Sequence, residues 1–231
     1  MNKKLSGIIG IVLSILLLVY FNTYFYKLLS LLNININNYS TLVKNIIDLV
    51  VNIILCVLIY LLYKRDFKHK RKDNIFKSII ILMVSVIGLV LIMYLFNYVI
   101  NYLGDIFNVS IKKNNFYNIF DKKLNIYLSI RIVKDYIIYP FIICSIILLS
   151  VDKIARRNDT YIILCGLLAS VCNALTLSGN ITYVIINSLN TFLIFVILSI
   201  MYRKSNNIWF SIILYGLYLM SNLLILKYIG W

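Results

Sequence analysis

The sequence predicts an all-α, polytopic membrane protein with about seven transmembrane helices. Hydrophobic residues occupy 62% of its 231 positions, charged residues only 13%, and the mean hydropathy is +0.91, which is outside the range of soluble globular domains. Apolar runs of about 20 residues recur along the chain, the length that an α-helix needs to cross the hydrocarbon layer. Backbone polar groups in lipid must be bonded within their own segment, so runs this long indicate helices rather than barrel strands.

Seven runs have a suitable length. The first follows Lys3 and Lys4 as a signal peptide would, but no small-residue cleavage pattern follows it, so we interpret it as a retained helix. No Pro-, Ser- or Gly-rich linker separates the runs, which predicts a single membrane domain over residues 1–231. The predicted spans are residues 7–26, 45–63, 78–100, 126–151, 161–177, 181–202 and 208–229.

Lysine and arginine residues predict the orientation, because they collect in short cytoplasmic loops. Segments 64–74, 152–159 and 202–207 carry six, three and two of them, and all three segments share the side of the N-terminus if seven helices alternate. We therefore predict a cytoplasmic N-terminus and an external C-terminus. The abundance of Ile, Asn, Lys and Tyr suggests an AT-rich bacterial genome, hence the bacterial cytoplasmic membrane.

The net charge of +15 does not predict nucleic-acid binding, because the excess lies in short loops and no basic domain stands outside the membrane. These loop charges instead suit contact with anionic lipid headgroups of the bilayer. The four cysteines lie inside predicted spans without CxxC spacing, and His69, the single histidine, lies in a loop. We therefore expect no metal site and no cofactor.

Polar residues within the spans are the candidate functional residues, because ionisable groups in a bilayer are costly unless they are paired or hydrated. Arg131 and Asp135 are one helical turn apart and can pair within their helix, which leaves Lys134 to pair with Asp48 of another helix. Two acids and two bases would form a charge-neutral cluster that fixes helix packing. The predicted intramembrane polar network comprises Asp48, Asn52, Arg131, Asn187 and Asn190.

Three segments in the second half of the chain share an order and spacing with a known family: KDYIIYPF, ASVCNALTLSGN and YRKSNNIWFSIILYGLYLMSNLL. Residues 126–224 thereby resemble the core of the CAAX protease and bacteriocin-processing (CPBP, or Abi) intramembrane proteases. The family's glutamate pair, followed four residues later by arginine and glycine, falls on Lys134, Asp135, Tyr139 and Pro140. Its Phe-x-x-x-His motif falls on residues 173–177, and the histidine of its last motif falls on Tyr215.

The resemblance implies a CPBP-like helical core, but this chain lacks the residues with which the family cleaves peptides. All eight acidic residues are aspartate, and the single histidine lies outside the core. We therefore expect a pseudoprotease without catalytic residues or cofactor. The degenerate site positions are Lys134, Asp135, Tyr139, Asn173 and Tyr215.

The resemblance also implies a function in binding. We expect a partner or scaffold for another membrane or exported cell-envelope protein, and the loop 104–125, with its lysines and aromatic residues, suits such contact. A bacteriocin self-immunity protein is the main alternative. An active peptidase that uses Asp135, or a transporter component, are further alternatives.

Overall fold

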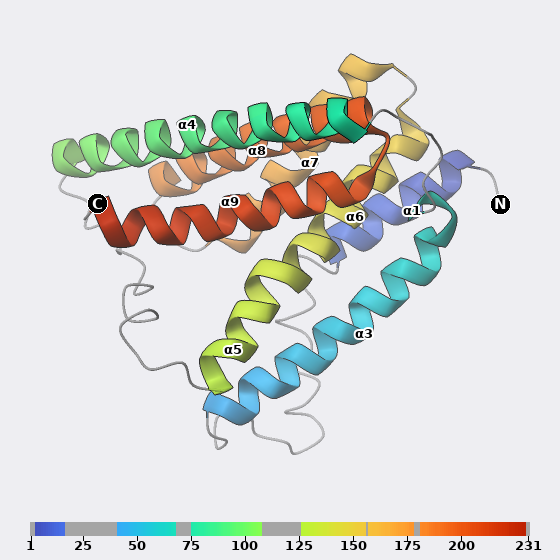
Figure 1. Ribbon diagram of the computed structural model, residues 1–231, viewed down its shortest axis with the longest axis horizontal. Helices are drawn as coiled ribbons and strands as arrows, with labels where there is room; N and C mark the ends of the chain where they lie inside the picture. Colours follow the sequence, from blue (N-terminus) through green and yellow to red (C-terminus); the bar gives the residue numbers. More distant parts are fainter. Residues whose placement is uncertain are drawn as a thin grey trace.

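The computed structural model describes residues 3–16, 41–67, 75–107, 126–155, 157–177 and 181–229. Every regular element in these ranges is a helix, which confirms the all-α prediction. Figure 1 shows α3 and α5 side by side, at an angle to α4, α8 and α9. The elements are α1 (Lys3–Ile15), α3 (Thr41–Phe67), α4 (Ile75–Phe107), α5 (Ile126–Val133), the π-helical turn η4 (Lys134–Ile138), α6 (Tyr139–Ile154), α7 (Asn158–Thr176), α8 (Ile181–Ser205) and α9 (Ile208–Ile229).

Five of these helical segments are long and apolar enough to cross a membrane, and they correspond to the second through sixth predicted spans. The first predicted span, residues 7–26, is described only as far as residue 16. In α9, residues Ile208–Ser221 form a shorter apolar helix. Seven spans therefore remain a prediction. The five segments are Leu42–Phe67, Ile79–Phe96, Ser129–Ile154, Asn158–Thr176 and Ile181–Ser205.

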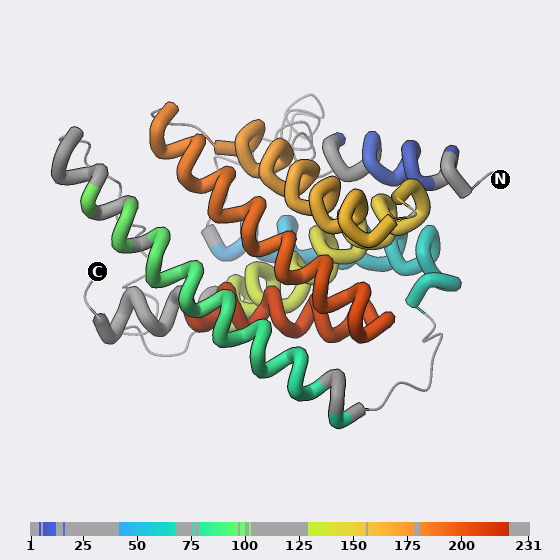
Figure 2. Tube along the Cα trace, turned by 90° about the horizontal axis from the view of Figure 1, so that it is seen from above, coloured from blue at the N-terminus to red at the C-terminus, as the bar shows by residue number. Residues whose placement is uncertain are grey.

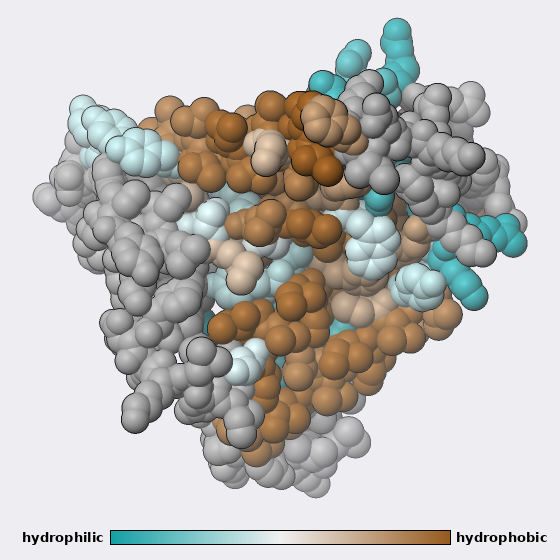
Figure 3. Space-filling view, viewed as in Figure 1, coloured by the Kyte–Doolittle hydropathy of each residue, from teal (hydrophilic) through white to brown (hydrophobic). Residues whose placement is uncertain are grey.

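The outer helices present apolar side chains, as expected of a protein that lies in lipid. Met83 and Leu91 of α4 are each 64% exposed, and Figure 3 shows hydrophobic bands over α4, α9 and α3. The 33 residues of α4 measure about 50 Å at 1.5 Å per residue, which exceeds the ~30 Å hydrocarbon layer. Because α4 continues to Phe107, the first residues of the predicted external loop 104–125 are helical, and residues 108–125 lie outside the described part.

The core of the bundle forms around α6. In an 18-residue apolar window of Ser129–Ile154, 61% of the residues are buried, whereas the share is 17–28% in the windows of the other four spans. Ten successive residues of α6, 142–151, are buried, and α1, α3, α7 and α9 all pack on this helix. In Figure 2, α4 runs alongside α8 and crosses over α9, and it contacts both. Residues far apart in sequence are thereby brought together around one central helix.

Helix α3 runs parallel to the continuous path of α5, η4 and α6. Three side-chain pairs join them: Asp48 with Lys134 at 3.8 Å, Tyr63 with Ser150 at 2.7 Å, and Asp66 with Lys153 at 3.2 Å. The 18 positions from Asp48 to Asp66 correspond to about 27 Å of helix, close to the thickness of the hydrocarbon layer. Because α3 and the α5–η4–α6 path run in the same direction, the helix between them in sequence, α4, has to cross the membrane in the opposite direction. This agrees with spans that alternate in direction.

Helix α1 approaches α6 closely through two glycines. Gly7 lies against Ile154, and a Cβ atom at Gly10 would collide with both Ser150 Oγ and the Tyr63 hydroxyl. Gly10 therefore sits directly over the hydrogen bond that joins α3 to α6. Small residues that allow close backbone approach are typical of helix contacts in membranes.

A two-residue turn joins α8 to α9. Asn206 adopts a positive φ of 49°, a conformation that asparagine tolerates better than most residues. The side chain of Asn207 accepts a hydrogen bond from the Trp209 N–H at 3.0 Å and so caps the start of α9. Ser211 then donates a hydrogen bond to the Leu198 carbonyl at 2.9 Å. This turn fixes α9 beside α8 and sets the depth of Tyr215.

We predict that Gly10→Ala lowers the melting temperature of the detergent-solubilised protein, whereas Gly88→Ala does not. At Gly10 the added methyl group would force the hydrogen-bonded Tyr63 and Ser150 side chains apart, and overpacking of this kind typically costs about 1–3 kcal/mol. At Gly88 the new Cβ would lie 3.6 Å from Ile197 Cδ1, an ordinary contact. Equal melting temperatures for the two variants would contradict the close approach of α1.

Candidate functional site

The candidate site begins at the π-helical turn η4. Pro140 has no N–H, so it cannot donate the regular helical bond to the Tyr136 carbonyl. The Tyr139 N–H instead bonds the Lys134 carbonyl five residues back. On the other side, Gly216 of α9 lies so close that a Cβ there would be 2.8 Å from the Tyr136 oxygen. The turn is held between the proline and α9, and π-helical turns are frequent at functional sites.

A charge-neutral cluster lies on this turn and its neighbours. Arg131 Nε is 3.4 Å from Asp135 Oδ2, and Lys134 Nζ is 3.8 Å from both Asp48 Oδ2 and Asp135 Oδ1. Both pairings expected from the sequence, within one helix and between two helices, are thus present. The four side chains are 22–35% exposed, so their mutual pairing reduces the cost of placing them in a bilayer.

A small polar cavity lies between α6, α7, α8 and α9. Its volume is about 50 Å³, several times the 10–15 Å³ that one water molecule requires. Tyr139, Asn173 and Tyr215 line it, so three of the five positions implied by the family resemblance meet there, whereas Lys134 and Asp135 do not line it. The remaining lining residues are Ile143, Ile147, Ala169, Cys172, Thr176, Thr191 and Phe195.

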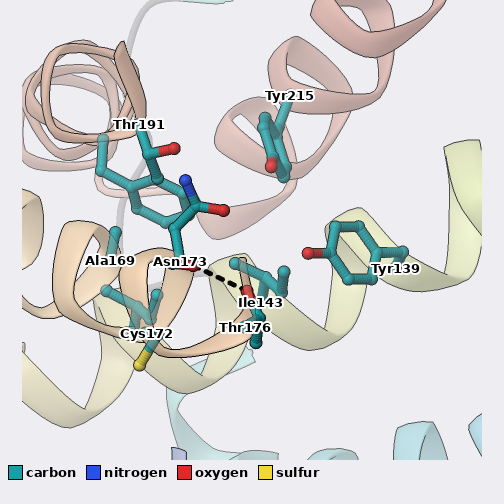
Figure 4. Close-up of a pocket in the computed structure, with 10 residues that line it drawn as sticks. Tyr139, Ile143, Ala169, Cys172, Asn173, Thr176, Thr191 and Tyr215 are labelled. Atoms are coloured by element: carbon teal, nitrogen blue, oxygen red, sulfur yellow. Dashed lines mark hydrogen bonds between the residues drawn. The ribbon is translucent and has the colours of Figure 1, made fainter. Parts of the chain in front are cut away.

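The side chains around the cavity have defined hydrogen-bonding roles. The Thr191 hydroxyl donates to the Asn187 carbonyl at 2.9 Å, and the Thr176 hydroxyl donates to the Asn173 carbonyl at 2.8 Å. Asn173 Nδ2 donates to the Asn187 carbonyl at 3.2 Å. Figure 4 shows the amide oxygen of Asn173 and the phenol oxygens of Tyr139 and Tyr215 directed toward the space between the helices.

Neighbouring rings fix the position of Tyr215, whereas Tyr139 is the more exposed of the two tyrosines. The Tyr215 ring meets Phe195 edge-on at 5.6 Å between ring centroids and stacks on Tyr218 at 6.3 Å. Tyr215 is 8% exposed and Tyr139 is 46% exposed. The Tyr215 phenol is therefore preset by packing, whereas Tyr139 combines an exposed residue surface with a hydroxyl that points inward (Figure 4).

The residues of the predicted intramembrane polar network lie in two places: Asp48, Asn52 and Arg131 on α3 and α5, and Asn187 and Asn190 on α8. Within the described part of the chain, the side-chain bonds of Asn187 and Asn190 stay among α8 and α9: Asn187 donates to the Tyr183 carbonyl at 2.9 Å, and Asn190 donates to the Tyr218 hydroxyl at 3.5 Å. Asn190 Oδ1 is buried without a hydrogen-bond partner there. Asn52 bonds the backbone carbonyl of Asp48 at 2.7 Å and not its carboxylate.

The cavity contains no group suited to acid–base chemistry at neutral pH. None of the described residues that line it is Asp, Glu, His, Lys or Arg, and the sulfur of Cys172 points away from the space in Figure 4. The described residues include no group of three or more His, Cys, Asp or Glu side chains that could hold a metal ion. The arrangement can bind water or a neutral polar group by hydrogen bonds.

A second ionic cluster lies at the opposite end of α6, and it cannot be assigned from the sequence. Arg203 of α8 is 3.0 Å from Asp152, donates to the Ala155 carbonyl at 3.1 Å, and lies 4.0 Å over the Tyr161 ring. In the sequence, the basic residues of segments 152–159 and 202–207 predict the orientation of the chain in the membrane, but not which acidic residue each of them pairs with. Likewise, Thr176 and Thr191 become cavity residues only when the rotation of α7 and α8 is known.

Comparisons with protein-family models, with curated proteins and with solved structures found no match.

We predict that Lys134→Asp and Asp48→Lys each reduce the yield and stability of the purified protein, and that the double variant restores much of both. Each single change places like charges together across α3 and η4, and the expected cost is about 1–3 kcal/mol, between exposed and buried ion pairs. Melting curves in detergent would measure this. A double variant no better than the worse single variant would exclude a direct contribution of the pair.

Proposed function

We propose that this chain is a noncatalytic, CPBP-like membrane protein that serves as a binding partner or scaffold for another membrane or cell-envelope protein. The observation that carries the proposal is the neutral cavity. Three positions that correspond to the family's active-site motifs, Tyr139, Asn173 and Tyr215, line one cavity from three helices. All of its lining groups suit binding, and none suits activation of a water molecule.

The ionic groups support the same proposal. Asp135, the only acid at the degenerate family positions, lies 3.4 Å from Arg131 and 3.8 Å from Lys134. This carboxylate is already engaged in ion pairs with both bases. The chain has no glutamate, and His69 lies outside the described residues. We therefore propose that the chain does not cleave peptides.

The arrangement of the helices also supports the proposed orientation in the bacterial cytoplasmic membrane. Helices α3, α6 and α8 all end with basic residues in their last turns. The pairs Asp66–Lys153 and Asp152–Arg203 bring these three ends together. Basic residues gathered on one side favour the cytoplasm for that side. We propose that this end is cytoplasmic, together with the N-terminus, and that the C-terminus is external.

We predict that gentle-detergent affinity purification of the tagged chain from its native membrane recovers one protein in near one-to-one amount, identified by mass spectrometry. The Lys134→Ala/Asp135→Ala double variant should recover less of it, because the cluster orients η4 beside the cavity. The matched control is Asp159→Ala/Lys204→Ala, which also removes one acid and one base but at exposed positions.

Recovery of the chain alone from wild-type membranes would contradict the scaffold proposal. Protection of a sensitive strain by this gene alone would then identify a bacteriocin self-immunity protein instead.

A further inference from the structure

We propose that the polar cavity between α6, α7, α8 and α9 receives the side-chain carboxamide of an asparagine or glutamine on a membrane-spanning helix of the partner protein. This inference rests on the proposed function and names the chemistry by which the partner is recognised. It follows from the hydrogen-bonding groups of the cavity, its lack of charge and its place within the spans.

The cavity has a surplus of hydrogen-bond acceptors. The hydroxyl protons of Thr176 and Thr191 are already donated to backbone carbonyls, so their oxygens can only accept further bonds. The amide nitrogen of Asn173 is turned toward the Asn187 carbonyl, which leaves its oxygen directed into the cavity (Figure 4). Three oxygen acceptors from α7 and α8 thus line one side.

The two tyrosines supply donors on the other side. Neither Tyr139 nor Tyr215 has a side-chain hydrogen-bond partner among the described residues, and both phenol oxygens point toward the cavity in Figure 4. A carboxamide carries two N–H donors and one carbonyl acceptor. Its NH2 group matches the acceptors of α7 and α8, and its carbonyl matches the phenol protons of Tyr139 and Tyr215.

The absence of charge excludes the other common polar ligands. Among the residues that the structure describes, no lining residue is Asp, Glu, His, Lys or Arg, so a bound ammonium, guanidinium or carboxylate would lack a counter-charge in the lining. An unpaired charge inside a protein or a bilayer is strongly unfavourable. A neutral group that both donates and accepts hydrogen bonds therefore fits best.

The position of the cavity favours a helix in the membrane as the source of this group. Each described lining residue belongs to a predicted span, so the cavity lies within the membrane-spanning part of the bundle. An asparagine on an otherwise apolar helix lacks hydrogen-bond partners in lipid, so it gains them by entering the cavity.

The test uses the full chain reconstituted in phosphatidylcholine vesicles with synthetic 24-residue Leu/Ala helices at low peptide-to-lipid ratio, which limits self-association of the peptides. Three peptides carry one asparagine each at successive helical turns, so that a mismatch in depth cannot hide binding. Two further peptides carry leucine or lysine at the central position. Energy transfer between labelled peptide and labelled protein gives the dissociation constant of each.

We predict that at least one asparagine peptide binds about threefold to tenfold tighter than the leucine peptide, the range expected for interhelical hydrogen bonds in membranes. The preference should fall in Tyr215→Phe and in Asn173→Leu, and it should persist in Tyr98→Phe, which removes the same hydroxyl from an exposed position on α4. Because Tyr215→Phe keeps the ring contacts with Phe195 and Tyr218, it tests the hydroxyl without removing the packing.

Equal binding of all asparagine and leucine peptides by the wild-type chain would overturn this inference, as would tighter binding of the lysine peptide. A preference that survives both Tyr215→Phe and Asn173→Leu would place the contact elsewhere and overturn it too. If a partner co-purifies from native membranes but the peptides show no preference, only the carboxamide inference fails. If no partner co-purifies, the proposed function fails independently of the peptides.

Discussion

The in-register, parallel contact between α3 and α6 is the constraint on which the rest of this bundle depends. Lipid provides no hydrophobic driving force between helices, so packing and polar pairs have to hold them together. Asp48–Lys134 lies near one end of this contact and Asp66–Lys153 near the other. With both ends fixed, α6 is oriented as the central helix, and α1, α7 and α9 pack around it. The cavity is a consequence of that orientation.

Much of this arrangement can be predicted from the sequence, because lipid leaves ionisable groups few choices. The helices are visible as long apolar runs. The pairing of Lys134 with Asp48 follows from charge balance, since Asp135 has a base one turn away in its own helix. The parallel course of α3 and α6 agrees with spans that alternate in direction. These features depend only on solvent and on net charge.

Other features depend on helix rotation and local backbone geometry, which apolar sequences specify weakly. Asn187 and Asn190 lie at helical spacing within a span, yet Asn187 bonds the Tyr183 carbonyl of its own helix, whereas Asn190 bonds the Tyr218 hydroxyl of α9. Pro140 marks an irregularity, but the π-helical turn also requires the close approach of Gly216. The cavity lining depends on where Thr176 and Thr191 direct their hydroxyl protons. Each of these details is decided by neighbouring helices, so a single sequence does not reveal it.

The π-helical turn also adjusts the length of one helix to that of another. Asp48 and Lys134 stand 86 positions apart in sequence, whereas Tyr63 and Ser150 stand 87 apart, as do Asp66 and Lys153. A hydrogen bond between residues five apart encloses one more residue than the regular α-helical bond. The π-helical turn η4 therefore accommodates the one residue by which the interval from Lys134 to Ser150 exceeds the interval from Asp48 to Tyr63. The turn that carries Lys134 and Asp135 thus allows two helices of unequal residue count to match across the same thickness of membrane.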